Sequence, residues 1–159
     1  MLIFLRVCLA NLIFVALNVH AATINISLMM DGNDTATAAD ATRLLKADPA
    51  MRNVKVKVWS MLDFPSQAAA ERTRSDTTFL KKSQHIFIST SVGRRFIDLA
   101  GEDIKQATQA GGKAYIVGNV WDADFPSFGL SKKPELTAYK EAGGAVNMAN
   151  MVRAAVAKQ

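Results

Sequence analysis

Residues 85–117 read HIFISTSVGRRFIDLAGEDIKQATQAGGKAYIV, and this stretch decides the predicted fold. It begins and ends with short apolar runs, over 85–90 and 113–117, each of a length typical of a buried strand. Between the runs, apolar side chains recur at helical spacing, at Phe96, Ala100, Ile104 and Ala107. Gly111 and Gly112 then end the helix. A strand, a helix and a second strand predict two parallel neighbours in one sheet.

The same alternation continues upstream of this unit. Residues 23–30 (TINISLMM) and 53–59 (NVKVKVW) alternate apolar and polar side chains as strands do. The alanine- and leucine-rich residues 36–47 between them predict a helix. A short helix is also expected over 66–74.

Downstream, an irregular segment rich in aromatic residues, Pro and Gly is expected over 120–131, and helices over 134–142 and 145–158. The complete pattern predicts one α/β domain over 22–159. We expect about four parallel strands flanked by helices in three layers, a flavodoxin-like or Rossmann-like arrangement.

Residues 1–21 read MLIFLRVCLANLIFVALNVHA and have the layout of a secretory signal peptide. A cation, Arg6, precedes an apolar run over 7–17, and small residues follow. We predict cleavage after Ala21, with an uncleaved membrane anchor as the alternative. Cleavage would remove Cys8 and His20 and leave a 138-residue periplasmic or secreted domain with no cysteine.

Composition restricts the chemistry of the chain. Its 159 residues are 50% hydrophobic and 21% charged, with a formal net charge of +5, which excludes disordered, collagen-like and disulfide-dense proteins. The cations are scattered along the sequence, which argues against a nucleic-acid partner. Asp31, Asn33 and Asp34 lack the spacing of a calcium loop and are interpreted as turn residues. We predict no metal site and no catalytic group; a core position for His85 is favoured over a role as an axial haem ligand.

Ligands of such sheets bind at the carboxyl ends of the strands. One candidate there is the segment Ser91-Val92-Gly93-Arg94-Arg95, where a glycine before a helix and two arginines suit an anion or a carboxylate. The alternative is that Arg94 and Arg95 are solvated residues at a helix start. The predicted ligand-binding residues in this segment are Ser91, Gly93, Arg94 and Arg95.

A second candidate is an internal repeat. Val58-Trp59 is followed by Asp63-Phe64-Pro65-Ser66, and Val120-Trp121 by Asp124-Phe125-Pro126-Ser127. Both copies follow a predicted strand, so their aromatic side chains could line one cleft for a flat ligand. The alternative is that they cover the ends of the core. The predicted binding residues from these segments are Trp59, Phe64, Asn119, Trp121, Asp122 and Phe125.

The C-terminal pattern Pro134-Glu135-Leu136-x-x-Tyr139-x-x-x-Gly143-Gly144-x-x-Asn147-x-x-Asn150-Met151 resembles a segment near the start of the cobaltochelatase large subunit and its relatives, which include the magnesium chelatase H subunit. The resemblance extends over about residues 23–155. It implies a stand-alone version of the N-terminal α/β domain of those long subunits, without the body that carries metal insertion.

These observations predict an exported, non-enzymatic module that binds or helps to handle a metal-tetrapyrrole, such as haem, cobalamin or a precursor. The alternative is an interaction subunit of a membrane transporter or a chelatase-like complex, with no small-molecule ligand. An enzymatic role for Asp31 with Asp122 or Asp124 has the least support from the sequence.

Overall fold

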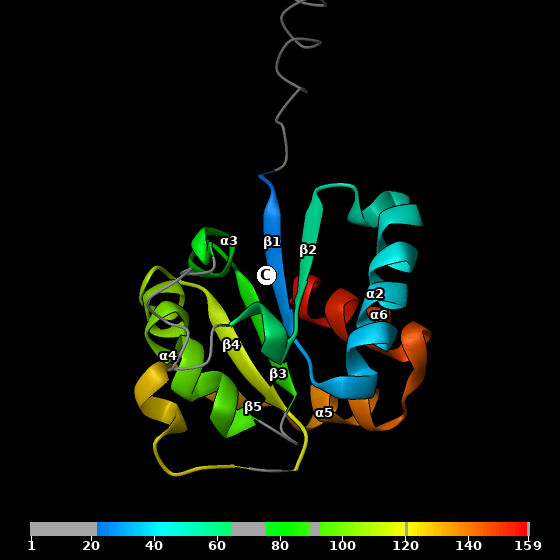
Figure 1. The fold of residues 1–159 in the computed structure, drawn as a ribbon. Helices are drawn as coiled ribbons and strands as arrows, with labels where there is room; N and C mark the ends of the chain where they lie inside the picture. Colours follow the sequence, from blue (N-terminus) through cyan, green and yellow to red (C-terminus); the bar gives the residue numbers. More distant parts are fainter. Residues whose placement is uncertain (1–21, 65–75, 90–92, 120, 159) are drawn as a thin grey trace, which may run out of the picture.

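The computed structural model describes residues 22–64, 76–89, 93–119 and 121–158, which form a parallel five-stranded sheet between two layers of helices (Figure 1). The strand order is β2-β1-β3-β4-β5. The strands are β1 (Ile24–Met29), β2 (Val54–Trp59), β3 (His85–Ser89), β4 (Lys113–Val117) and β5 (Leu130–Lys132). The predicted three-layer α/β class is confirmed, and the order is that of flavodoxin-like sheets.

The sheet has five strands, whereas about four were predicted. Strand β5 overlaps the end of the segment expected to be irregular and pairs with β4, with Leu130 opposite Ala114. Three residues are too few to show an alternating pattern in the sequence, so β5 can be recognised only from its pairing with β4. Gly129 precedes it with a φ of 76°, and a Cβ atom there would lie 2.5 Å from Thr108 Oγ1 on the neighbouring helix. Glycine therefore allows the chain to turn into β5 close to that helix.

Each face of the sheet carries its own helices. One face holds α2 (Gly32–Ala47), α5 (Pro134–Glu141) and α6 (Gly144–Val156). The other holds α3 (Thr78–Lys81), α4 (Gly93–Gln109) and the 3₁₀ turn η3 (Phe125–Phe128). Helix α2 begins four residues before the predicted start, α3 was not predicted, and the helix expected over 66–74 lies outside the described residues.

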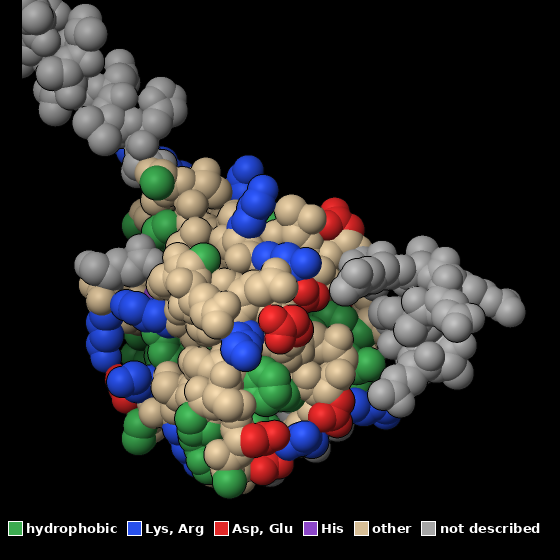
Figure 2. All heavy atoms as spheres, turned by 90° about the vertical axis from the view of Figure 1, so that its left-hand side faces the viewer, with side chains coloured by type: hydrophobic (Ala, Val, Ile, Leu, Met, Phe, Trp, Pro, Cys, Tyr) green, Lys and Arg blue, Asp and Glu red, His purple; other side chains and the backbone are tan. Residues whose placement is uncertain are grey.

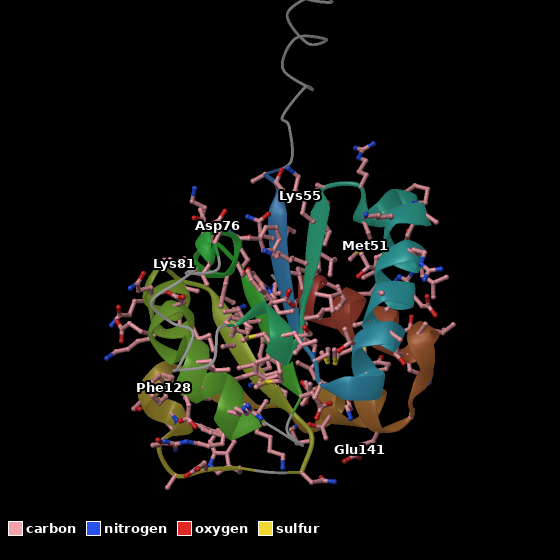
Figure 3. All side chains as sticks on the ribbon, viewed as in Figure 1. Met51, Lys55, Asp76, Lys81, Phe128 and Glu141 are labelled. Atoms are coloured by element: carbon pink, nitrogen blue, oxygen red, sulfur yellow. The ribbon has the colours of Figure 1, made fainter. Side chains whose placement is uncertain are left out.

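The alternation of side chains along β3 separates two hydrophobic cores. Phe87 points to the core beneath α2 and α6, while Ile86 and Ile88 point to the core beneath α4. All five β3 residues are buried, which explains the nearly continuous apolar run. On the α4 side, Phe128 of η3 lies beside the helix (Figure 3), and a Cβ at Gly101 would come within 2.8 Å of its ring.

The carboxyl ends of the strands lie at the lower edge of the molecule in Figure 1. The strand order reverses between β1 and β3, and the helices that follow them, α2 and α4, lie on opposite faces. Their first turns therefore diverge at this edge, where doubly wound sheets bind ligands. We call it the carboxyl edge. Among the described residues, no helix has the length and apolar character needed to cross a membrane.

Candidate functional site

Arg94, in the first turn of α4, is held by three carboxylates at the carboxyl edge. Its Nε donates to Asp98 Oδ1 at 2.9 Å, and its Nη1 donates to Asp124 Oδ2 at 2.6 Å and to Asp122 Oδ2 at 3.3 Å. Hydrogen bonds to Asp124 and then Asp98 raise the pKa of Arg94 above its ordinary value. These bonds fasten the segment after β4 to the start of α4, and an anionic ligand at Arg94 would compete with all three carboxylates.

The rest of the predicted anion site is only partly described. Gly93 is the first residue of α4, and Ser91 lies outside the described residues. Arg95 is exposed in the same helical turn and forms no ion pair within the described part of the chain. Of the two arginines, Arg95 is therefore the one whose charge faces solvent without a carboxylate partner there.

The prediction that Trp59, Phe64 and Phe125 line an open cleft is wrong. Their exposed fractions are 1%, 5% and 0%, and all three belong to the core beneath α4. Trp59 stacks on Phe64 with ring centroids 5.5 Å apart, and its Nε1 donates to Ser27 Oγ at 2.9 Å. The Trp59 ring and its N–H both have partners inside the protein, and the rings of Phe64 and Phe125 are buried as well. None of the three rings can therefore stack on a ligand at the surface.

Trp121 differs from the other aromatics of the repeat, because 41% of it is exposed. It packs edge-on against buried Phe125, with centroids 5.6 Å apart. The next residue, Asp122, is bonded to Arg94, and Asn119 is exposed two residues before Trp121. The structure thus leaves a single half-exposed aromatic ring from the predicted set, in a segment that Arg94 fixes.

A polar cluster at the point where the strand order reverses was not predicted. Ser89, at the end of β3, donates to Asp34 Oδ2 at 3.3 Å and lies 3.4 Å from Asp31 Oδ1. Lys140 of α5 pairs with Asp34 at 2.8 Å. The polar residue that ends the otherwise apolar β3 was the available signal, whereas nothing in the sequence connects Lys140 with this cluster. Within the described ranges, no group of three or more His, Cys, Asp or Glu side chains could hold a metal ion.

His85 lies inside the protein, away from any surface ligand. It is fully buried and stacks on Tyr115 and Phe87, with ring centroids 6.1 Å and 6.4 Å away. Burial, and to a smaller extent the charge of Lys113, lowers its pKa to about 4. The imidazole is therefore neutral at neutral pH, and its burial prevents it from reaching the iron of a haem at the surface.

The face that carries α3 and α4 has charges of both signs interspersed with apolar side chains (Figure 2). Comparison of the chain with protein-family models, with curated proteins and with solved structures gave no match. The resemblance to the chelatase subunits stays a prediction from the C-terminal pattern, and the function has to be argued from the geometry of the carboxyl edge.

Proposed function

We propose that the chain is an exported, non-enzymatic binding module that presents its carboxyl edge to a partner protein. The observation that carries this proposal is Trp121, which is half exposed on a segment fixed by the contacts of Arg94 with Asp122 and Asp124. A tryptophan held in place before binding loses little conformational entropy in a complex, and Trp and Arg are the residues most enriched among energetically dominant interface contacts.

The apolar side chains at this edge support the same reading. Leu62, in the 3₁₀ turn η2 (Met61–Asp63) that follows β2, is 95% exposed. Arg94 and the cluster around Asp34 are already bonded within the chain, whereas Trp121, Leu62 and Arg95 are exposed, and Arg95 forms no ion pair in the described part of the chain. Such a mixture of apolar groups and a cation suits a protein surface. The resemblance of the C-terminal pattern suggests a chelatase-like chain or a transporter of the tetrapyrrole pathway as partner.

A photo-crosslinking amino acid at position 121 of the full chain, expressed in its source cells, tests this proposal. Position 44 provides the matched control, because Leu44 of α2 has the same exposed fraction of 41% but lies on a helix that covers one face of the sheet. We expect a discrete adduct from position 121, identified by mass spectrometry as a chelatase-like or transport protein, and none from position 44. Equal adducts from both positions, or none from either, would contradict the proposal.

Handling of a metal-tetrapyrrole is the second candidate function, and it is favoured by a half-exposed tryptophan and an exposed arginine at the same edge of the sheet. A half-exposed indole offers a stacking surface for a flat ring, and Arg95, next to Arg94 in sequence, could meet a carboxylate. Because three of the four predicted aromatic side chains are buried, Trp121 alone among the predicted residues offers a stacking surface.

Titration of the protein with haem, with cobalamin and with metal-free porphyrin tests this second candidate, using the absorption bands of each compound as the readout. Tetrapyrrole handling predicts saturable binding that the substitutions Trp121→Ala and Arg95→Gln both weaken. Arg43→Gln is the matched control, since Arg43 is an exposed arginine on α2. The absence of a saturable change with all three compounds would reject tetrapyrrole binding and leave the proposal of a protein partner intact.

A further inference from the structure

A cavity of about 340 Å³ lies between β4, β5, α5 and α6, on the face of the sheet opposite α4. Its sides come from all four elements, and its lining includes the apolar side chains of Leu136 and Ala155. Tyr115 of β4 and Ser131 of β5 are opposite each other in the strand register and both line it. None of its residues belongs to the carboxyl-edge site described above.

The charge of the cavity is strongly asymmetric. Lys113, Lys133 and Lys158 line it together with one acidic residue, Glu135, so two positive charges are in excess. Lys158 pairs with Glu135 at 3.1 Å. Within the described ranges, neither Lys113 nor Lys133 forms an ion pair. Two ammonium groups therefore border the cavity outside any ion pair there, and the charge of Lys133 also helps to lower the pKa of Glu135.

Glu135 illustrates which groups this environment stabilises. A hydrogen bond from its own backbone N–H, and then the contact with Lys158, hold the pKa of Glu135 below its ordinary value. The lining thus already stabilises one ionised carboxylate. Burial, with Glu135 as a smaller cause, raises the pKa of Tyr115, so the Tyr115 hydroxyl keeps its proton and can act as a donor.

The first turn of α5 has no free amide to offer an anion. The N–H groups of Leu136 and Thr137 both donate to the carbonyl of Lys133, at 3.0 Å and 3.1 Å, Pro134 has no N–H, and Glu135 binds its own amide. Phosphate sites commonly add such amides or the fork of an arginine to their lysines, and this lining offers neither. Lysines on β4, just before α5 and just after α6, together with an apolar wall, suit two separated carboxylates joined by a short carbon chain.

We infer that this cavity binds a small organic dicarboxylate, with Lys113 and Lys133 as its main cationic contacts. The Tyr115 hydroxyl supplies a hydrogen-bond donor at the sheet, whereas the Ser131 hydroxyl already donates to the carbonyl of Ala114 and only borders the cavity. Leu136 and Ala155 contact the carbon chain. The inference does not depend on the proposed function at the carboxyl edge. Binding here would make the protein responsive to a small metabolite at a site separate from its partner surface.

Isothermal titration calorimetry with succinate at low ionic strength tests the inference on the full chain. Lys113 and Lys133 are both exposed, so Lys113→Gln and Lys133→Gln should preserve the fold, which circular dichroism can verify. We expect saturable one-to-one binding of succinate, weakened about tenfold by each substitution because each removes a charge-assisted contact. Lys46→Gln, an exposed lysine in the last turn of α2, is the matched control and should leave the affinity unchanged.

Inorganic phosphate and acetate serve as comparison ligands. Weaker binding of both than of succinate supports a site for two separated carboxylates. The absence of saturable succinate binding at millimolar concentration would overturn the inference. Phosphate binding as tight as that of succinate, or an equal loss of affinity in Lys46→Gln, would overturn it as well, because either result indicates general attraction of anions to a basic surface.

Discussion

The two copies of the Val-Trp…Asp-Phe-Pro-Ser repeat share six residue types, with a spacer of three residues in the first copy and two in the second, and they differ in structure. In the first copy Trp59 is the last residue of β2 and is 1% exposed, whereas in the second Trp121 lies beyond the end of β4 and is 41% exposed. The phenylalanines of both copies, Phe64 and Phe125, are buried in the same core beneath α4. The two copies therefore agree in their phenylalanines, which are both buried, and differ in their tryptophans, of which one is buried and the other is half exposed.

The position of each tryptophan relative to its strand explains the difference. Trp59 is inside β2, opposite Met29 in the register, so the pleat directs its ring onto the α4 side of the sheet, where Ser27 accepts its N–H. Strand β4 ends at Val117, four residues before Trp121, so no pleat fixes that ring. The difference shows that a motif following a strand cannot be assigned to core or surface without the exact residue at which the strand ends.

The largest expected effect is the difference in stability between variants that lack one or the other tryptophan. Trp59→Ala should lower the free energy of unfolding by about 3–5 kcal/mol, since it removes a buried ring from the core. Trp121→Ala should lower it by less than about 1 kcal/mol, because much of that ring is in water. Urea denaturation followed by circular dichroism measures both. Similar losses for the two variants would contradict the assignment of one ring to the core and the other to the surface.

Acid should destabilise the fold that buries Trp59. The pKa of His85 is about 4 in the folded protein and about 6.5 when unfolded, so the unfolded chain takes up a proton first as the pH falls. Stability is therefore complete above pH 6.5 and decreases as the pH falls toward 4, by about 2 kcal/mol once solvent screening is allowed for.

Urea denaturation at several pH values, followed by the fluorescence of a variant that retains only Trp59, measures this loss. His85→Phe keeps an aromatic ring between Phe87 and Tyr115 but cannot take up a proton. We expect it to reduce the loss of stability between pH 6.5 and 4. A pH dependence identical to that of the parent protein would show that other groups cause it.

A smaller effect concerns the polar contacts that keep Trp59 in place. The hydroxyl of Ser83 donates to the carbonyl of Phe79, so that of Ser27 donates to Ser83 and accepts from Trp59 Nε1. Ser27→Ala leaves the buried indole N–H without this acceptor and should cost about 1–2 kcal/mol. Ser131→Ala, at the outer strand β5, is the control and should cost less; an equal loss in thermal denaturation would contradict the role of Ser27.

The smallest expected effect concerns the contacts that hold Trp121 in place. Arg94→Gln removes the ion pairs with Asp98, Asp122 and Asp124, which are half exposed and should therefore contribute little to stability. It should nevertheless loosen the segment after β4, so that acrylamide quenches Trp121 more strongly, with no change for Trp59. Arg43→Gln on α2 is the control, and unchanged quenching in Arg94→Gln would mean that packing on Phe125 alone positions the ring.

Apolar or alternating runs made the sheet predictable, and contacts between residues far apart in the sequence made parts of the site unpredictable. The strands over 24–29, 54–59, 85–89 and 113–117 each carry a period-two or fully apolar pattern, so they were expected within one or two residues. Strand β5 has three residues and depends on the free edge of β4. In the candidate site, the position of Arg94 at the start of α4 was expected, but its three carboxylate partners lie 4 to 30 residues away and depend on the fold.

The sequence by itself determined the α/β class, the parallel direction of the strands and the absence of cysteine chemistry from residues 22–159, because periodicity and composition are local properties of the chain. Only the tertiary structure decided that Trp59 is core and Trp121 surface, that Arg94 binds its own chain, and that three lysines border one cavity. These outcomes depend on strand ends and on contacts between residues far apart in the sequence, and such contacts exist only once the sheet and its helices have packed.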